Sequence, residues 1–219
     1  MKKFKEKTCK DVFHAFLVED AYYEGKDEIP CIKTSKDFPN RIITFSKALR
    51  TTDYDQWVAF YENDECIARI WNNPRRYLPI LKRFRGIIAP DFSLYRTMPI
   101  VMQKWSTYKS RALANWFISQ GIEVIPNVRF ADPRSYEFCF LGVEHYSTIA
   151  IGSIGCLNSL IERGFFIDGL KMAVNVLKPK TIVVYGSAPS DIFDIYISQG
   201  IRILQFDSNT SAVFKGVTL

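Results

Sequence analysis

The second half of the chain repeats one pattern, in which a short apolar run is followed by a polar turn and by a longer segment with helical spacing. RGIIAPD (residues 85–91) precedes a predicted helix over about 99–120, and IEVIPNVRF (122–130) is the next apolar run. Ile, Val and Ala do not alternate with polar residues in RGIIAPD, which is typical of a strand buried on both faces. Gly121 fits position C′ of the helix. The pattern therefore predicts α/β units that share a largely parallel sheet.

The same pattern predicts further elements on both sides of this unit. Two earlier runs rich in β-branched and aromatic residues, 41–49 and 56–62, are predicted strands. Three later strands are expected over 147–155, 181–187 and 201–207, with helices over 166–178 and 190–200. Ser190 is the expected N-cap of the last helix.

Two helices carry features that test the interpretation. PRRYLPILKRF (74–84) predicts a short helix with Asn73 as its N-cap and with Pro79 weakening its interior. On the long helix, one apolar sector is expected to hold Met102, Trp105, Leu113, Trp116 and Phe117. Another face holds Gln103, Thr107 and Arg111, for which a buried salt bridge and a solvent role are both open.

We interpret residues 1–40 as an N-terminal extension, with a short helix around 12–17, and residues 41–219 as a single α/β domain. An irregular or reduced (β/α) barrel is favoured over an open doubly wound sheet. The reason is that nearly every strand ends in polar or glycine residues, as expected of a ring of functional loops. In both arrangements the carboxyl ends of the strands converge on one edge, where a site is expected.

Two carboxylates follow strands that are adjacent in the chain. Asp91 and Asp132 are the candidate catalytic residues, because neighbouring carboxylates can divide acid and base roles or hold Mg²⁺. Mg²⁺ is therefore a possible cofactor. The alternative is that each aspartate caps a helix or pairs with a nearby arginine.

Two glycine-bearing turns, GSIGC (152–156) and YGSAPSD (185–191), lie between a strand and a helix, where backbone amides can bind phosphate. Ordinary tight turns are the alternative. Cys156 is placed at the start of the following helix, where a thiol pKa can be lowered, and the alternative is a small, half-buried neighbour of the helix cap. Candidate ligand-binding residues at the strand ends are Lys47, Ser93, Asn127, Arg129, Ser153, Gly155, Tyr185, Gly186 and Ser187.

The formal net charge of +6, from 29 Lys and Arg against 23 Asp and Glu, suits an anionic partner. A nucleic-acid-binding protein is the alternative function, and its candidate contacts are Arg75, Arg76, Lys82 and Arg83 together with the lysines of residues 1–10. The basic patch can equally be a solvated helix face. A protein-binding inhibitor or scaffold is a further alternative.

Five cysteines at scattered spacings, without a C-x-x-C pair, predict free thiols in a reducing compartment. No run of about 18 apolar residues and no signal-peptide core is present, so we expect a cytoplasmic protein without a membrane span. A hydrophobic content of 47% indicates a folded chain.

The blocks WVAFYENDE, RGIIAPDFSLY, GIEVIPNVRFAD, STIAIGSIGC and IVVYGS resemble those of an uncharacterised family from bacteria, phages and mobile elements, catalogued only as a domain of unknown function. The resemblance covers roughly residues 40–207. It implies a cytoplasmic protein of a prophage or plasmid and brings no established activity. We therefore expect a phage or mobile-element protein that binds a phosphorylated or nucleotide-type small ligand at its strand ends. Whether it sequesters or processes that ligand, and whether it is an enzyme, stay open.

Overall fold

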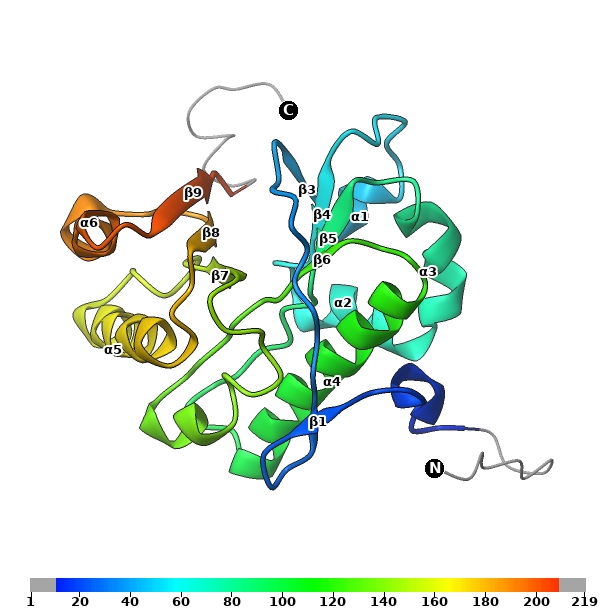
Figure 1. The fold of residues 1–219 in the computed structure, drawn as a ribbon, viewed down its shortest axis with the longest axis horizontal. Coiled ribbons are helices and arrows are strands. Elements are labelled where there is room, and N and C mark those ends of the chain that lie inside the picture. The colour runs from blue at the N-terminus through cyan, green and yellow to red at the C-terminus, as the bar shows by residue number, and fades with distance from the viewer. Residues whose placement is uncertain (1–10, 209–219) are drawn as a thin grey trace.

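Parallel strands in two sheets form the centre of the computed structural model, which describes residues 11–208 (Figure 1). The first sheet has the order β3 (Ile42–Thr44), β4 (Trp57–Ala59), β5 (Gly86–Ile88) and β6 (Val124–Ile125). The second has the order β7 (Thr148–Gly152), β8 (Thr181–Tyr185) and β9 (Arg202–Phe206). A parallel bridge between Asn127 and Ala150 links the end of β6 to β7. The strands therefore follow one another in chain order.

The helices divide between the two sheets. In Figure 1 the first sheet lies beside α1 (Phe45–Ala48), α2 (Asp64–Asn72) and α3 (Pro74–Leu81), and the second beside α5 (Leu160–Leu177) and α6 (Ser190–Ser198). The long helix α4 (Ile100–Ser119) joins β5 to β6. Two 3₁₀ helices, η1 (Ala15–Val18) and η2 (Pro133–Glu137), and a hairpin of β1 (Tyr23–Glu24) and β2 (Ile29–Pro30) complete the described chain.

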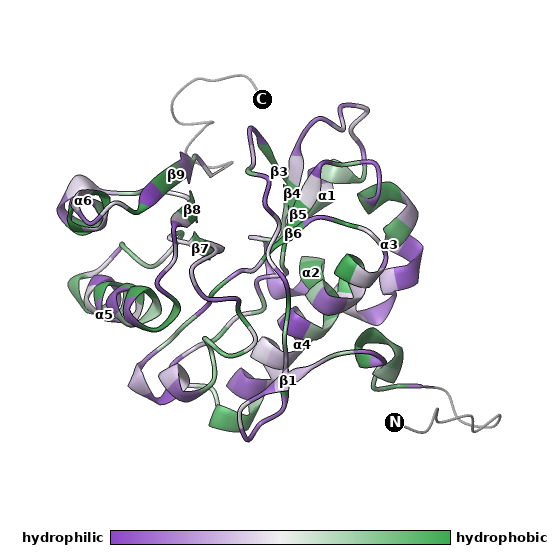
Figure 2. Ribbon diagram, in the orientation of Figure 1, coloured by the Kyte–Doolittle hydropathy of each residue, from purple (hydrophilic) through white to green (hydrophobic). Residues whose placement is uncertain are grey.

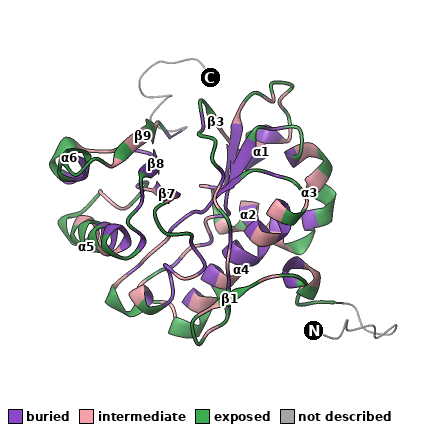
Figure 3. Ribbon diagram, in the orientation of Figure 1, coloured by how far each residue is buried: buried purple, intermediate pink, exposed green. Residues whose placement is uncertain are grey.

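Alternate residues of the strands point to opposite sides, and both sides are apolar. In β8, Val183 belongs to one cluster, whereas Ile182 and Val184 belong to another that includes residues of α5 and α6. The cluster that contains Val183 draws residues from all the strands β3 to β9, so these strands curve around one common interior. Figure 2 shows hydrophobic residues and Figure 3 buried residues along the central strands, while the outer side of α3 is exposed.

The prediction of an α/β fold with a mostly parallel sheet is confirmed. Neither sheet reverses its strand order, as a doubly wound sheet would. Within residues 11–208 no strand pairing joins β3 to β9, so the closure of a barrel stays a prediction. The boundary at residue 40 also stays a prediction. The segment before it packs on α4, since Asn115 Nδ2 donates to the Leu17 carbonyl over 2.9 Å and Lys104 pairs with Asp27.

Local signals placed several element ends correctly. The Asn73 side chain accepts a hydrogen bond from the Arg76 N–H and caps α3 as predicted. Gly121 has φ +82°, as expected after a helix. Ser190, however, is the first residue of α6, and Pro189 occupies the N-cap position.

Several sequence-based element predictions were wrong. The strand expected over 41–49 ends at Thr44 and continues as α1. Of the strand expected over 122–130, only β6 forms, and it ends before Pro126, which lacks an N–H. The helix expected from residue 166 begins at Leu160, where Ser159 accepts a hydrogen bond from the Glu162 N–H. Helix α2 was not predicted. In place of the short helix expected around 12–17, the described chain, which begins at residue 11, forms the 3₁₀ helix η1 over Ala15–Val18.

The apolar sector predicted on α4 is only partly buried. Leu113, Trp116 and Phe117 lie in the core, but Met102 and Trp105 are exposed. The face that carries Gln103, Thr107 and Arg111 is buried instead. Polar side chains on a buried face need hydrogen-bond partners, and these partners determine how α4 is fixed.

Arg111 is fully buried and donates to three backbone carbonyls. Its Nε donates to Leu141 over 3.1 Å, Nη1 to Asn127 over 2.8 Å and Nη2 to Cys139 over 3.0 Å. Burial lowers the pKa of Arg111 to about 10, which leaves the side chain cationic at neutral pH. Neither of the two sequence-based roles for Arg111 is correct, because its partners are carbonyls and not a carboxylate or solvent. The side chain ties α4 to the segment that follows β6.

None of the helices in residues 11–208 combines the length and the apolar composition that a membrane crossing requires.

Replacing Arg111 with methionine is expected to lower the free energy of unfolding by about 3 kcal/mol, because three buried carbonyls lose a charged donor. Urea unfolding followed by circular dichroism measures this change. Arg85→Met is the matched control, since Arg85 is exposed and pairs with exposed Asp55, and its loss should cost under about 1 kcal/mol. Equal stability of the two variants would contradict the role of Arg111.

Candidate functional site

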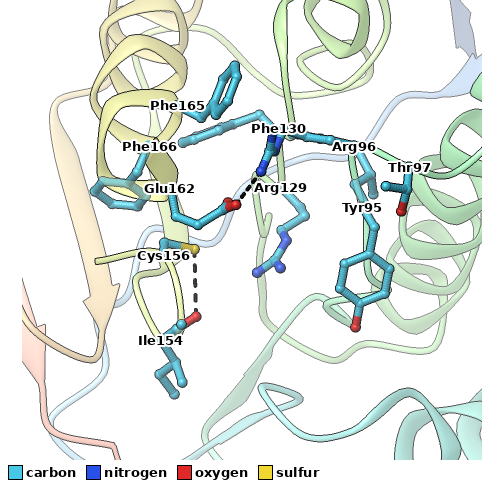
Figure 4. A pocket seen from close by; sticks show the side chains of 13 residues that line it. Tyr95, Arg96, Thr97, Arg129, Phe130, Ile154, Cys156, Glu162, Phe165 and Phe166 are labelled. Carbon is cyan, nitrogen blue, oxygen red and sulfur yellow. Dashed lines mark hydrogen bonds and ion pairs between the residues drawn. The ribbon is translucent and has the colours of Figure 1, made fainter. Parts of the chain in front are cut away.

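A pocket of about 560 Å³ lies at the carboxyl ends of β5, β6 and β7 (Figure 4). Its walls come from the loop after β5, the segment after β6, the turn after β7 and the first turns of α5. The charged side chains among its lining residues are Arg96, Arg129 and Glu162. Aromatic rings of Tyr95 and of the Phe residues 130, 165 and 166 supply much of the remaining surface.

Arg129 extends its guanidinium into the space between the walls in Figure 4. Its Nη1 lies 3.4 Å from Asp91 Oδ2, and the negative charge of Asp91 raises the pKa of Arg129. A guanidinium has five N–H donors. Within residues 11–208, Arg129 forms this one long hydrogen bond and no other. The pocket therefore contains a largely buried cation whose hydrogen-bonding capacity is mostly unused.

Behind Arg129, a chain of hydrogen bonds fixes the orientation of Asp91. Asn127 Nδ2 donates to Asp91 Oδ1 over 2.7 Å, and the Tyr61 hydroxyl donates to Asn127 Oδ1 over 2.9 Å. The Tyr61 ring stacks on Tyr185, with centroids 4.7 Å apart and planes 9° from parallel. Because Asn127 is held at both ends, its amide has one orientation, and Asp91 is aimed at Arg129.

Burial raises the pKa values of two residues in this hydrogen-bond chain, Asp91 and Tyr61. It raises the pKa of Asp91 above the ordinary value of 3.8, although Arg129 and Asn127 act in the opposite direction. Burial also raises the pKa of Tyr61 well above its ordinary range, with a further contribution from the charge of Asp91. Asp91 therefore occupies a site where its charged form is costly, which is common at functional positions.

Asp132 has different partners from Asp91. It is the N-cap of η2, where its side chain accepts a hydrogen bond from the Arg134 N–H over 3.1 Å. It also forms an ion pair with the Arg134 guanidinium, which lowers the pKa of Asp132. These contacts are the ones expected if Asp132 caps a helix and pairs with a nearby arginine. The acid–base pairing of Asp91 with Asp132 stays a prediction.

The two glycine-bearing turns differ in what surrounds them. Gly155, with φ +76°, lines the pocket and has open space where a Cβ would lie. At Gly152 a Cβ would come within 2.8 Å of the Tyr61 ring, and at Gly186 within 2.5 Å of Ser153 Oγ. Close packing of side chains therefore gives a reason for glycine at these two positions that does not require phosphate. Ser153 Oγ is buried and has no hydrogen-bond partner among the described residues.

The other predicted ligand-binding residues lie away from the pocket lining. Lys47 is exposed on α1, Ser187 is exposed after β8, and the Ser93 N–H donates to Asp64 Oδ1 over 3.1 Å. Tyr185 contributes through its stacking on Tyr61. Of the predicted ligand-binding residues, Arg129 and Gly155 thus line the pocket, Asn127 lies behind it and holds Asp91, and these others lie outside it.

Sequence reasoning missed Tyr95, Arg96 and Glu162 as pocket residues. Arg96 forms an ion pair with Glu162, and its guanidinium also lies 4.4 Å from the centroid of the Phe165 ring. The two charged residues are far apart in the chain. No spacing rule pairs them, so no sequence signal was available.

Cys156 also lines the pocket. Burial raises the pKa of its thiol, while the positive charge of Arg129 acts in the opposite direction. Of the two interpretations of Cys156, the lowered pKa is contradicted, because α5 begins only at Leu160 and burial outweighs the nearby charge, and the half-buried thiol agrees with the structure. Cys31, Cys66, Cys139 and Cys156 are free thiols, and Cys9 lies outside the described residues.

The residues proposed for nucleic-acid contact are exposed on or directly after α3. Arg75 stacks on Phe16 at 3.9 Å and Arg83 on Tyr54 at 3.7 Å, so aromatic rings hold both side chains. The lysines of residues 1–10 lie outside the described part. Nucleic-acid binding by this surface stays a prediction.

In residues 11–208 no three or more His, Cys, Asp or Glu side chains gather as a metal site would require. Near the pocket, Asp91 is held by Asn127 and Arg129, and Asp64 by the Ser93 N–H. A role for Mg²⁺ stays a prediction.

Comparison with known proteins agrees with the family resemblance seen in the sequence. A family model described as Domain of unknown function (DUF4417) matches residues 21–207. The Gene 1 proteins of Mycobacterium phages D29 and L5 are each 35% identical over 127 residues, or 58% of this chain. That segment covers 47% and 56% of the relatives, so the chain spans about half the length of the curated relatives it matches. No solved structure matches.

The opposite pKa shifts of the two aspartates predict opposite effects of removing their charges. Because the pKa of Asp91 is raised on folding, the folded chain binds the extra proton, and stability falls as pH rises through the window above 3.8. Asp91→Asn copies the protonated form, so it should raise the melting temperature at neutral pH. The gain should vanish at acidic pH, where Asp91 is already protonated.

Asp132→Asn is the matched variant, since the pKa of Asp132 is lowered on folding. Its stabilising effect is present above 3.8 and is lost as pH falls through the folded-state value. The variant should therefore be less stable at neutral pH, by under about 1 kcal/mol, and equal to the wild type in acid. Thermal unfolding across pH measures both. Shifts of the same sign in the two variants would contradict these assignments.

Proposed function

The chain belongs to the family described as Domain of unknown function (DUF4417), and we propose that it binds a small phosphorylated or nucleotide-type ligand in the pocket around Arg129. The observation that carries this proposal is the state of Arg129, a largely buried cation with a single long hydrogen bond in the described chain. The Arg129 side chain is 24% exposed, so its remaining N–H donors are accessible from the pocket, where an anionic ligand would accept hydrogen bonds from them.

Three further features support an anion at this position. Asp91 neutralises Arg129 only from one side and is itself fixed by Asn127, so the guanidinium is presented to the pocket in one orientation. Gly155 leaves room for a close backbone approach. The volume of about 560 Å³ is within the usual range of small-ligand sites.

The aromatic lining favours a ligand with a flat apolar part in addition to its charge. Tyr95 is exposed at the pocket, and Phe130 forms part of the wall from which Arg129 extends. A nucleotide combines a planar base, which can stack on aromatic rings, with a phosphate that suits arginine. In a phage or mobile-element setting, such binding could sequester or process a nucleotide.

The first test is native mass spectrometry of the freshly purified chain, compared with its denatured mass. An added mass of nucleotide size would identify the ligand class. A heterogeneous added mass with excess absorbance at 260 nm relative to 280 nm, both removed by high salt, would favour nucleic acid. A bare mass would favour the protein-binding alternative and would argue against a tightly held nucleotide.

Calorimetric titration with AMP and with inorganic phosphate tests the role of Arg129 directly. Arg129→Gln is expected to weaken binding tenfold to a hundredfold, because a hydrogen bond to a charged group contributes about 1.5–3 kcal/mol. Arg83→Gln, which removes an arginine stacked on Tyr54, should leave the affinity unchanged. Equal affinity of wild type and Arg129→Gln, with the fold intact by circular dichroism, would refute the proposal.

A further inference from the structure

Both arginines that line the pocket are paired with a carboxylate. Arg129 lies beside Asp91, and Arg96 forms an ion pair with Glu162. In Figure 4, Arg96 extends from the loop after β5 to Glu162 on α5, and the Arg129 guanidinium lies below this pair in the view. The Arg96–Glu162 pair therefore joins two opposing walls of the pocket.

The two carboxylates differ in their exposure to solvent and in the number of hydrogen bonds that hold them. The Asp91 side chain is 11% exposed and accepts a second hydrogen bond from Asn127. The Glu162 side chain is 45% exposed, and within residues 11–208 its carboxylate accepts a hydrogen bond from Arg96 alone. Partly exposed ion pairs contribute little to stability. The Glu162 carboxylate is therefore the exchangeable partner, whereas Asp91 is fixed.

Arg96 is positioned independently of Glu162. Arg134 Nη2 donates to the Arg96 carbonyl over 2.6 Å, and the Arg96 guanidinium lies against the Phe165 ring. These contacts would remain if the Glu162 carboxylate moved away. Arg96 would then present a planar set of donors, which matches phosphate oxygens in a bidentate manner.

We infer that the Glu162 carboxylate competes with the ligand for Arg96. A doubly charged phosphate that binds to Arg129 and Arg96 together displaces Glu162 from Arg96. This inference rests on the proposed function and specifies its ligand class. The ligand carries a terminal phosphate with two negative charges, because a singly charged group would not be attracted to Arg96 strongly enough to replace the carboxylate of Glu162. Glu162 thus determines which anions the pocket accepts.

The test is calorimetric titration of the full chain with inorganic phosphate and with AMP at pH 8, where both are dianions because their second pKa is about 6. Glu162→Gln keeps the shape of the side chain and removes its charge, so phosphate and AMP should bind about threefold tighter or more. Methanesulfonate, a monoanion of similar shape, should bind the wild type more weakly than phosphate and gain less from the substitution, because it gains at most its own weaker interaction with Arg96.

Two further variants separate local competition from a general charge effect. In the double variant Arg96→Gln/Glu162→Gln, the gain should disappear, because the residue for which Glu162 competes is absent. Glu65→Gln removes an exposed negative charge in the first turn of α2, outside the pocket lining, and should leave phosphate affinity unchanged.

The outcomes distinguish this inference from the proposed function. If Arg129→Gln abolishes binding but Glu162→Gln leaves affinity unchanged or weaker, the competitor role is overturned and the proposed function stands. If the gain from Glu162→Gln persists without Arg96, competition for Arg96 is also overturned. If neither the wild type nor any variant binds phosphate or AMP, or if Arg129→Gln binds normally, the proposed function fails and this inference with it.

Discussion

One buried cation determines where the pocket residues lie. Arg111 donates to the carbonyls of Asn127, Cys139 and Leu141, so the long helix α4 is fixed to the segment that follows β6. That segment carries Arg129, which lines the pocket, and Asn127, which donates a hydrogen bond to Asp91 behind it. A buried arginine without a carboxylate partner is tolerated only if its donors are satisfied. The carbonyls need Arg111 as much as Arg111 needs them, because they belong to an irregular segment and have no neighbouring strand in the described chain to donate to them.

The floor of the site is continuous with the interior of the strands. Tyr61 follows β4 and Tyr185 ends β8, yet their rings stack at the carboxyl end of the interior cluster. Gly152 leaves the space that the Tyr61 ring needs. From this stack, hydrogen bonds lead through Asn127 to Asp91 and so to Arg129. Packing inside the sheets and charge at the pocket are thus parts of one arrangement.

The sequence was sufficient where structure depends on local pattern, and insufficient where it depends on contacts between distant segments. Most strands and the long helix were predicted, because apolar runs and helical spacing are local signals. Asp91, Asn127 and Arg129 were predicted at the site because they follow strands whose carboxyl ends must converge. Arg96 and Glu162 were not, because their pairing exists only after two loops and a helix come together. The burial of the α4 face that carries Arg111 was not predicted for the same reason.

The pocket lies across the joint between the two sheets, with walls from the loops after β5 and β6 on one side and from β7 and α5 on the other. In the described chain, strand pairing across this joint is the single bridge between Asn127 and Ala150. Regions joined by few backbone hydrogen bonds open as separate cooperative units in native-state hydrogen exchange. A ligand that touches both walls would couple these units. Amide protection in both sheets would then rise together with occupancy.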